Sequence, residues 1–231
     1  MNRSFLRPLA LALAAACACG AAAEGSGWLR KGSSLLYRDA GGEIAAEIGL
    51  GRWEDSGESV VTEGGVLAQG RFAWTLSRRV LRFFGSNGHE LWSEDGADAP
   101  PGGEPLVCSA SGEVCLLALR RSAWFVALKT SLGNTLWEAG PFPRLESLQI
   151  SANGRYGLAL WNEPDRSSAH SFLDLAARAR RDVPSARFLL GKTAIDDQGR
   201  AFSGEQLAFE FSASTGTAPS VSTAAAAGAR P

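Results

Sequence analysis

Turns that contain glycine recur along this chain at nearly constant spacing, and this recurrence constrains the fold more than any other feature. In one series a polar residue precedes the glycine and a charged residue follows it; its members are Gly70, Gly112, Gly154 and Gly199, spaced 42, 42 and 45 residues apart. In a second series a hydrophobic segment leads into a turn at Gly42, Gly88, Gly133, Ala177 and Gly216, spaced 46, 45, 44 and 39 residues apart. Because both series advance together, each period contains two hairpins and therefore about four strands.

The segments between these turns have the pattern of short strands. Residues 114–119 and 157–161 are nearly continuous apolar runs, as expected of strands that are covered on both faces. Four strands in roughly 40–45 residues is the size of a propeller blade. The sequence therefore predicts an all-β fold, a small β-propeller of four to five blades of antiparallel four-stranded sheet, one of which is an N-terminal half-blade.

Two groups of segments resemble the repeats of known propellers. Residues 86–92, 128–137 and 211–216 resemble the strand-turn-glycine repeat, often ending in tryptophan, of PQQ-like propellers. The turns at Gly112 and Gly154 resemble those of the WD40-like propellers of bacteria. The resemblance covers about residues 34–217 and implies that Trp92 and Trp137 pack between neighbouring blades. It implies no ligand role for either tryptophan.

The N-terminus has the pattern of a signal peptide. Arg3 and Arg7 precede an apolar run over 9–16, and three alanines before Glu24 form a cleavage site. We therefore expect residues 1–23 to be removed and the protein to be periplasmic or secreted. The run is shorter than the ~20 residues that span a bilayer, so no transmembrane span is expected. Cys17 leaves open an alternative, a lipoprotein anchored to the membrane, although Leu13 lies one place too far from it for the usual bacterial lipobox.

Only Cys108 and Cys115 remain in the expected mature chain. If Ser111 and Gly112 form a two-residue turn, the two cysteines lie directly opposite one another in a hairpin. A three-residue loop would instead turn them to opposite faces. In an oxidising compartment the first register predicts a structural disulfide.

The charge balance and the segment boundaries complete the domain description. Lys plus Arg is 23 and Asp plus Glu is 24, which gives no electrostatic argument for a nucleic acid or an anionic membrane as partner. Residues 94–105 and 162–169 are expected to be polar loops. The predicted domains are a signal peptide over 1–23, a propeller domain over 24–217 and a disordered, low-complexity tail over 218–231.

Candidate catalytic and metal-binding residues are few. Residues 186–193 meet a relaxed phosphate-loop pattern, but their bulky side chains and the lack of a following helix argue against it. His89 and His170 lack any metal-ligand spacing and are expected to be solvated turn residues. The acidic residues Glu94, Asp95 and Asp98 lack the alternating ligands of a calcium loop. Asp196 and Asp197 fit turn chemistry better than calcium binding. Arg178, Arg180 and Arg181 are expected on a solvated strand face, or alternatively to dock an acidic partner.

These features favour a non-catalytic exported propeller that binds another envelope or secreted protein and needs no cofactor. Two alternatives stay open. One is an enzyme, a dehydrogenase or a hydrolase, with its active site at the mouth of the propeller. The other is a glycan-binding module that uses Trp28 or Trp53 as an exposed platform.

Overall fold

The computed structural model describes residues 26–55, 57–163, 168–184, 193–203 and 206–210. The predicted signal peptide, Cys17, Gly216, the tail over 218–231 and most of the segment 186–193 lie outside the described residues.

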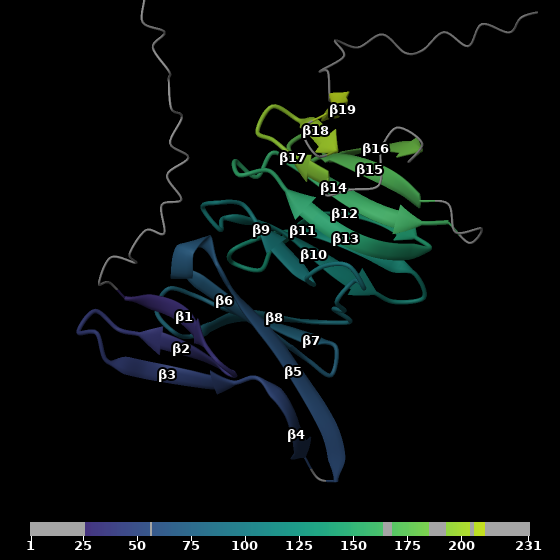
Figure 1. Cartoon of the computed structure of the whole chain (residues 1–231). Coiled ribbons are helices and arrows are strands. Elements are labelled where there is room, and N and C mark those ends of the chain that lie inside the picture. Colours follow the sequence, from purple (N-terminus) through teal and green to yellow (C-terminus); the bar gives the residue numbers. More distant parts are fainter. Residues whose placement is uncertain (1–25, 56, 164–167, 185–192, 204–205, 211–231) are drawn as a thin grey trace, which may run out of the picture.

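The described residues form five antiparallel sheets that follow one another along the chain (Figure 1). The first sheet contains β1 (Gly27–Lys31), β2 (Ser34–Arg38) and β3 (Ile44–Gly49). The second contains β4 (Gly51–Asp55), β5 (Glu58–Leu67), β6 (Phe72–Ser77), β7 (Val80–Phe84) and β8 (Glu90–Asp95), with a single 3-10 turn, η1 (Ala68–Gly70), between β5 and β6. The third contains β9 (Leu106–Cys108), β10 (Val114–Arg120), β11 (Trp124–Thr130) and β12 (Thr135–Phe142). The fourth contains β13 (Arg144–Ile150), β14 (Tyr156–Asn162), β15 (Ser168–Asp174) and β16 (Ala179–Pro184). The fifth contains β17 (Thr193–Ile195), β18 (Arg200–Ser203) and β19 (Gln206–Glu210).

The all-β prediction is confirmed, as sheets of three to five strands that do not close on one another. Four strands are found in the third and fourth sheets, but the first sheet has three and the second has five. The difference arises where the chain leaves β3 at Leu50 and enters β4 at Gly51, whose φ of 108° suits glycine. β4 thereby joins the second sheet as an additional edge strand, which the regular spacing of the turns did not indicate.

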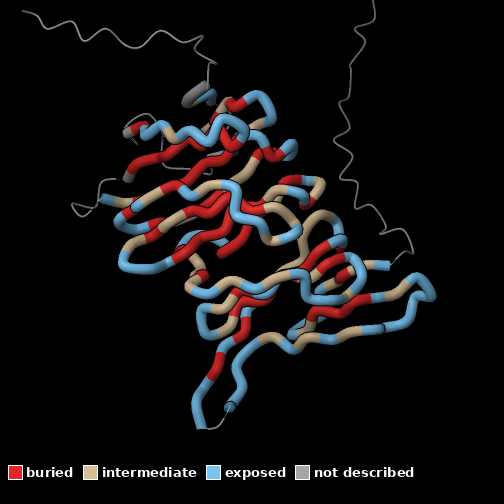
Figure 2. The backbone as a smooth tube through the Cα atoms, turned by 180° about the vertical axis from the view of Figure 1, so that it is seen from behind, coloured by how far each residue is buried: buried red, intermediate tan, exposed pale blue. Residues whose placement is uncertain are grey.

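The hydrophobic core lies between successive sheets as four clusters, and Figure 2 shows the buried residues along the middle of the strands. β10 explains the continuous apolar run over 114–119, because alternate side chains face different neighbours. Leu117 and Leu119 pack against the second sheet, whereas Leu116 and Ala118 pack against the fourth. β14 behaves in the same way: Ala159 packs toward the third sheet and Leu158 toward the fifth. The interior sheets are thus covered on both faces.

The glycine turns join adjacent strands as the sequence predicts. The first-series glycines precede β6, β10, β14 and β18, and all of them have φ between 73° and 92°. The second-series turns connect β2 to β3, β7 to β8, β11 to β12 and β15 to β16. Successive turns of the first series also contact one another directly. Arg71 donates to the carbonyl of Ser111 at 3.0 Å, Ala110 donates to the carbonyl of Ala152 at 2.8 Å, and the backbone N–H of Asn153 donates to Asp197 at 2.7 Å.

Candidate interaction groove

β4 and β5 form a hairpin that extends away from the other sheets (Figure 1). All five residues of β4 are exposed, and within the described residues β4 pairs only with β5. Its outer edge therefore presents backbone N–H and C=O groups without a neighbouring strand. An exposed edge of this kind is a template on which another strand can pair.

A groove of about 450 Å³ lies beside this hairpin, and we call it the Trp53 groove. Trp53 is 41% exposed, although it pairs with the buried Val60 across β4 and β5. Ile48 of β3 lines the groove from the first sheet, and the other lining residues belong to the second sheet and its turns. Its lining residues are Ile48, Trp53, Asp55, Val60, Thr62, Thr75, Ser77, Arg78, Val80, Arg82 and Phe84.

The rim of the groove carries both signs of charge. Arg78 lies in the tight turn between β6 and β7 with a φ of 50°, and its guanidinium lies 3.0 Å from Asp55 and 3.2 Å from Glu58. Arg82 lies 3.9 Å from Glu90 and is largely exposed. Exposed ion pairs contribute little to stability, about 0–1 kcal/mol. Exchanging these pairs for contacts with a ligand therefore costs the fold little.

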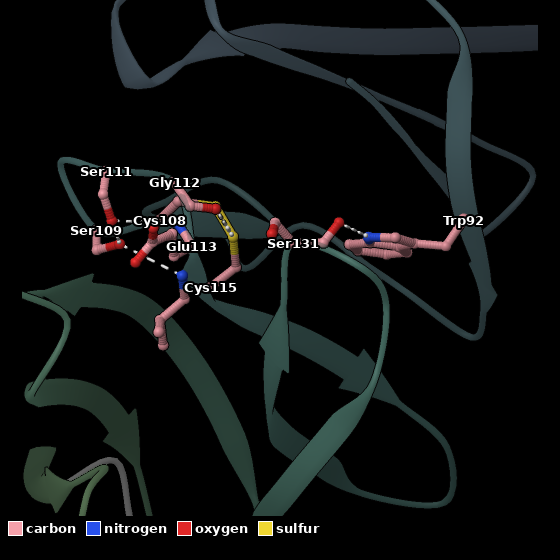
Figure 3. The surroundings of a disulfide bond; sticks show 9 residues. Trp92, Cys108, Ser109, Ser111, Gly112, Glu113, Cys115 and Ser131 are labelled. Atoms are coloured by element: carbon pink, nitrogen blue, oxygen red, sulfur yellow. Dashed lines mark hydrogen bonds between the residues drawn. A yellow bond between two sulfur atoms is a disulfide. The ribbon is translucent and has the colours of Figure 1, made fainter. Parts of the chain in front are cut away.

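The predicted disulfide is present, and Figure 3 shows it beside the contact between Trp92 and Ser131. Cys108 and Cys115 are directly opposite one another in β9 and β10. The loop is longer than the two residues expected, because the N–H of Ser109 donates to the carbonyl of Val114 at 2.9 Å and leaves residues 110–113 as the loop. The expected two-residue turn and the observed four-residue loop give the same strand register, so the two cysteines face the same side of the hairpin.

The tryptophans and glycines singled out from the repeats meet at the contacts between sheets. Trp92 lies against Gly133 of the following sheet, and its Nε1 donates to the carbonyl of Ser131 at 3.2 Å. Trp137 is half-buried and packs against the cluster between the third and fourth sheets. Two other aromatic residues, which the repeat pattern did not mark, also lie against a turn glycine of the following sheet. Tyr37 lies against Gly88, and a Cβ built on Gly112 would overlap the ring of Phe72.

Three residues that were expected to be exposed are buried or half-buried instead. His170 is in β15, not in a loop, and desolvation by burial lowers its pKa to about 4. Trp28 is buried and donates to the carbonyl of Gly85 at 2.8 Å, so it offers no platform for a glycan. Arg180 stacks over Phe142 at 4.2 Å and binds Asp182 through two hydrogen bonds, so it does not lie on a purely solvated face. The contacts of Trp28 with Gly85 and of Arg180 with Phe142 join segments that are distant in sequence.

The acidic residues are engaged in structural contacts. Glu94 binds Lys129 at 2.7 Å, and Asp98 binds Arg120 at 3.2 Å. Asp196 accepts from the N–H groups of Gln198 and Arg200 within its turn; although desolvation acts in the opposite sense, these hydrogen bonds lower its pKa. His89 lies in an exposed turn, as expected. Among the described residues, no three His, Cys, Asp or Glu side chains are grouped so that they could hold a metal ion.

Comparisons with known proteins leave the family of this chain open. No family model matches it, and no curated protein matches it. A solved structure of Kuenenia stuttgartiensis hydrazine synthase aligns with 73% of this chain and 48% of that chain, at 15% identity and a TM-score of 0.47. The chain thus spans about half the length of that protein. In the part of the chain that the structure describes, no helix is long and apolar enough to cross a membrane.

Proposed function

We propose that this protein is a non-catalytic, exported β-propeller scaffold whose β4 edge and Trp53 groove bind an extended segment of another envelope or secreted protein. The observation that carries the proposal is the unpaired edge of β4 with the exposed Trp53 beside it. Strand addition at such an edge gains affinity from backbone hydrogen bonds, and side-chain pockets next to the edge give specificity.

Three features support the propeller arrangement and export. Each sheet is a meander of neighbouring strands, as in the blades of a propeller. The first-series turns contact one another from the second sheet to the fifth, as expected of turns that converge near a common axis. The disulfide between Cys108 and Cys115 fits an oxidising compartment, as the signal peptide pattern does.

The groove defines the chemistry of the bound segment. The apolar side chains of Ile48, Val60 and Phe84 accept an apolar side chain of the partner, which Trp53 then covers. Arg82 on the rim favours an acidic residue near the end of that segment, because its own pair with Glu90 is long and exposed. The expected partner is therefore an extended polypeptide. Every second residue of its bound segment is apolar, and an acidic residue lies near the end of that segment.

Site-specific photo-crosslinking in cells tests this proposal. A photoreactive phenylalanine derivative is placed at position 53, and the matched control carries it at position 132, since Leu132 is also apolar and is 73% exposed in the turn between β11 and β12. We expect one discrete protein adduct from position 53 and none from position 132, and loss of the adduct when Arg82→Glu is added. Equal labelling from both positions, or no adduct, would overturn the proposal.

The alternatives give different results with the purified protein. Quenching of tryptophan fluorescence by a sugar, lost in Trp53→Ala, would favour a glycan-binding module. Dehydrogenase activity that appears only after PQQ and calcium are added would favour an enzyme.

A further inference from the structure

The five sheets follow one another in a row, and the two sheets at its ends each have one face that no other described sheet covers. The four core clusters join the first sheet to the second, the second to the third, the third to the fourth and the fourth to the fifth. Among the described residues no cluster joins the fifth sheet to the first, and Figure 1 shows β1 and β19 at opposite ends of the molecule. Each end of the row is therefore a surface on which a further sheet can pack.

The uncovered face of the first sheet is apolar at its centre. Trp28 of β1 packs against the second sheet. Because side chains alternate along a strand, Leu29 and its cross-strand partner Leu36 face away from that sheet. Ile44 of β3 pairs with Arg38 of β2 on this same face and is 56% exposed. We call Leu29, Leu36 and Ile44 the N-terminal end face.

The uncovered face of the fifth sheet is apolar as well. Ile195 and Ala201 pack against the fourth sheet, so Ala194 and Phe202, which are paired across β17 and β18, face away from it. Leu207 of β19 pairs with Phe202 and is 55% exposed. We call Ala194, Phe202 and Leu207 the C-terminal end face.

Phe202 occupies a place that is fully buried in the interior sheets. It is the third residue of β18, as Leu116 is the third residue of β10 and Leu158 the third residue of β14. Leu116 is 0% exposed because the fourth sheet covers it, and Leu158 is 1% exposed because the fifth sheet covers it. Phe202 has no following sheet among the described residues and is only half-buried. The C-terminal end face therefore has the position of an interior contact without its cover.

The turn at Gly42 shows the corresponding gap at the other end of the row. In the equivalent turns of the second and third sheets, a Cβ on Gly88 or Gly133 would lie 2.7 Å from the ring of an aromatic residue of the preceding sheet, Tyr37 or Trp92. A Cβ on Gly42 would meet nothing within 4 Å. The first sheet thus lacks, at this turn, the preceding neighbour that the second and third sheets have.

We infer that the C-terminal end face of one copy of this chain binds the N-terminal end face of a second copy. A second copy is the occupant that repeats the contact already present between successive sheets, because each of those contacts joins the same two kinds of face. Such a heterologous contact builds a ring where the rotation closes and a filament where it does not. The two end faces share no residue with the Trp53 groove, so the contact does not depend on the proposed partner.

Sedimentation equilibrium of the full protein tests the inference. Ile44→Asp puts a charge on the N-terminal end face, and Leu207→Asp puts one on the C-terminal end face. Both side chains are more than half exposed, so neither change is expected to shift the urea midpoint of unfolding. We expect the wild type to associate as its concentration rises. Each variant alone is expected to associate about tenfold more weakly or less, because the contact would bury an unpaired charge.

An equimolar mixture of the two variants identifies a head-to-tail contact. Ile44→Asp keeps an intact C-terminal end face and Leu207→Asp keeps an intact N-terminal end face, so the mixture is expected to form a complex of two copies and nothing larger. Leu132→Asp is the matched control, because Leu132 is 73% exposed in a turn of an interior sheet. This control is expected to associate as the wild type does.

Four results would overturn the inference. The first is a wild type that stays monomeric at every concentration, as expected if another segment of the same chain covers the end faces. The second is a mixture that stays monomeric although the wild type associates. The third is a variant, Ile44→Asp or Leu207→Asp, that associates as tightly as the wild type, which would assign the association to another surface. The fourth is equal weakening by Leu132→Asp.

Discussion

Trp92 of the second sheet lies directly on Gly133 of the third, so that a Cβ atom at residue 133 would be 2.7 Å from Cγ of the indole. The indole also donates to Ser131 in the same turn, and the ammonium of Lys129 lies 5.0 Å from the centre of the ring (Figure 3 shows the Ser131 contact). The glycine therefore has two roles: it allows the positive φ of the turn, and it leaves room for the neighbouring sheet.

Alanine substitutions separate these two roles. Gly42 and Gly133 have nearly the same φ, 83° and 86°, but a Cβ on Gly42 would meet nothing within 4 Å. We expect Gly42→Ala to lower the free energy of unfolding by about 1 kcal/mol, from backbone strain alone. Gly133→Ala is expected to cost about 3 kcal/mol, because Trp92 must also move. Urea denaturation measures both; equal losses would show that the contact between the sheets contributes nothing.

Removing the disulfide is expected to cost a modest amount of stability. Cys108 and Cys115 are seven residues apart, and closing so short a loop stabilises the folded chain by about 2 kcal/mol. The double variant Cys108→Ala/Cys115→Ala should therefore unfold at lower urea concentration than the oxidised protein. A reductant should destabilise the wild type and leave the double variant unchanged. If a reductant also lowered the stability of the double variant, the loss seen in the wild type would not come from this disulfide.

Substitutions of Lys129 and Glu94 should lower the stability of the fold by different amounts. The side chain of Lys129 is 4% exposed, and its ammonium lies 2.7 Å from the carboxylate of Glu94, whose side chain is 28% exposed. Glu94→Gln leaves a buried charge without its counter-ion and is expected to cost on the order of 2 kcal/mol. Lys129→Met removes the buried charge and keeps an apolar stem against Trp92, so it should cost less. Thermal unfolding of the two variants checks this order, and the reverse order would mean that the pair itself is strongly stabilising.

His170 should make stability depend on pH. Its pKa is about 4 in the folded protein, against 6.5 as the ordinary value, so the unfolded chain binds more protons between these values. The contribution of neutral His170 is complete above pH 6.5 and is lost as the pH falls toward 4, by about 3 kcal/mol in total.

The two histidines provide the comparison. In His170→Leu, the loss of unfolding free energy between pH 6.5 and 4 should be smaller than in the wild type by about that amount. In His89→Gln the loss of unfolding free energy between pH 6.5 and 4 should equal that of the wild type, because His89 lies in an exposed turn. Identical pH profiles for wild type and His170→Leu would exclude the assignment.

Features set by neighbours in the sequence could be predicted. The spacing of the glycines identified the hairpins, because a positive φ at the turn is a local requirement. The pairing of Cys108 with Cys115 likewise followed from a turn between them. The apolar runs at β10 and β14 correctly indicated strands buried on both faces.

Features set by distant segments could not be predicted in the same way. The serines around 167–171 suggested a loop, yet His170 lies in β15, paired with Leu160 of β14 on one side and Val183 of β16 on the other. Trp28 was expected on the surface because nothing local shows that Gly85 of the next sheet accepts its hydrogen bond. The Trp53 groove depends on β4 joining the second sheet at Gly51, and the short Gly-Leu-Gly sequence over 49–51 is the local signal for this change of sheet.

Hydrogen exchange of the backbone amides in β4 tests whether the partner segment pairs with this edge. The whole protein is compared alone and with the partner segment recovered by crosslinking at position 53. We expect the segment to slow exchange in β4, over Gly51–Asp55, and to leave β8, at the opposite edge of the same sheet, unchanged. Slower exchange in β8 or in the glycine turns, with β4 unaffected, would contradict it.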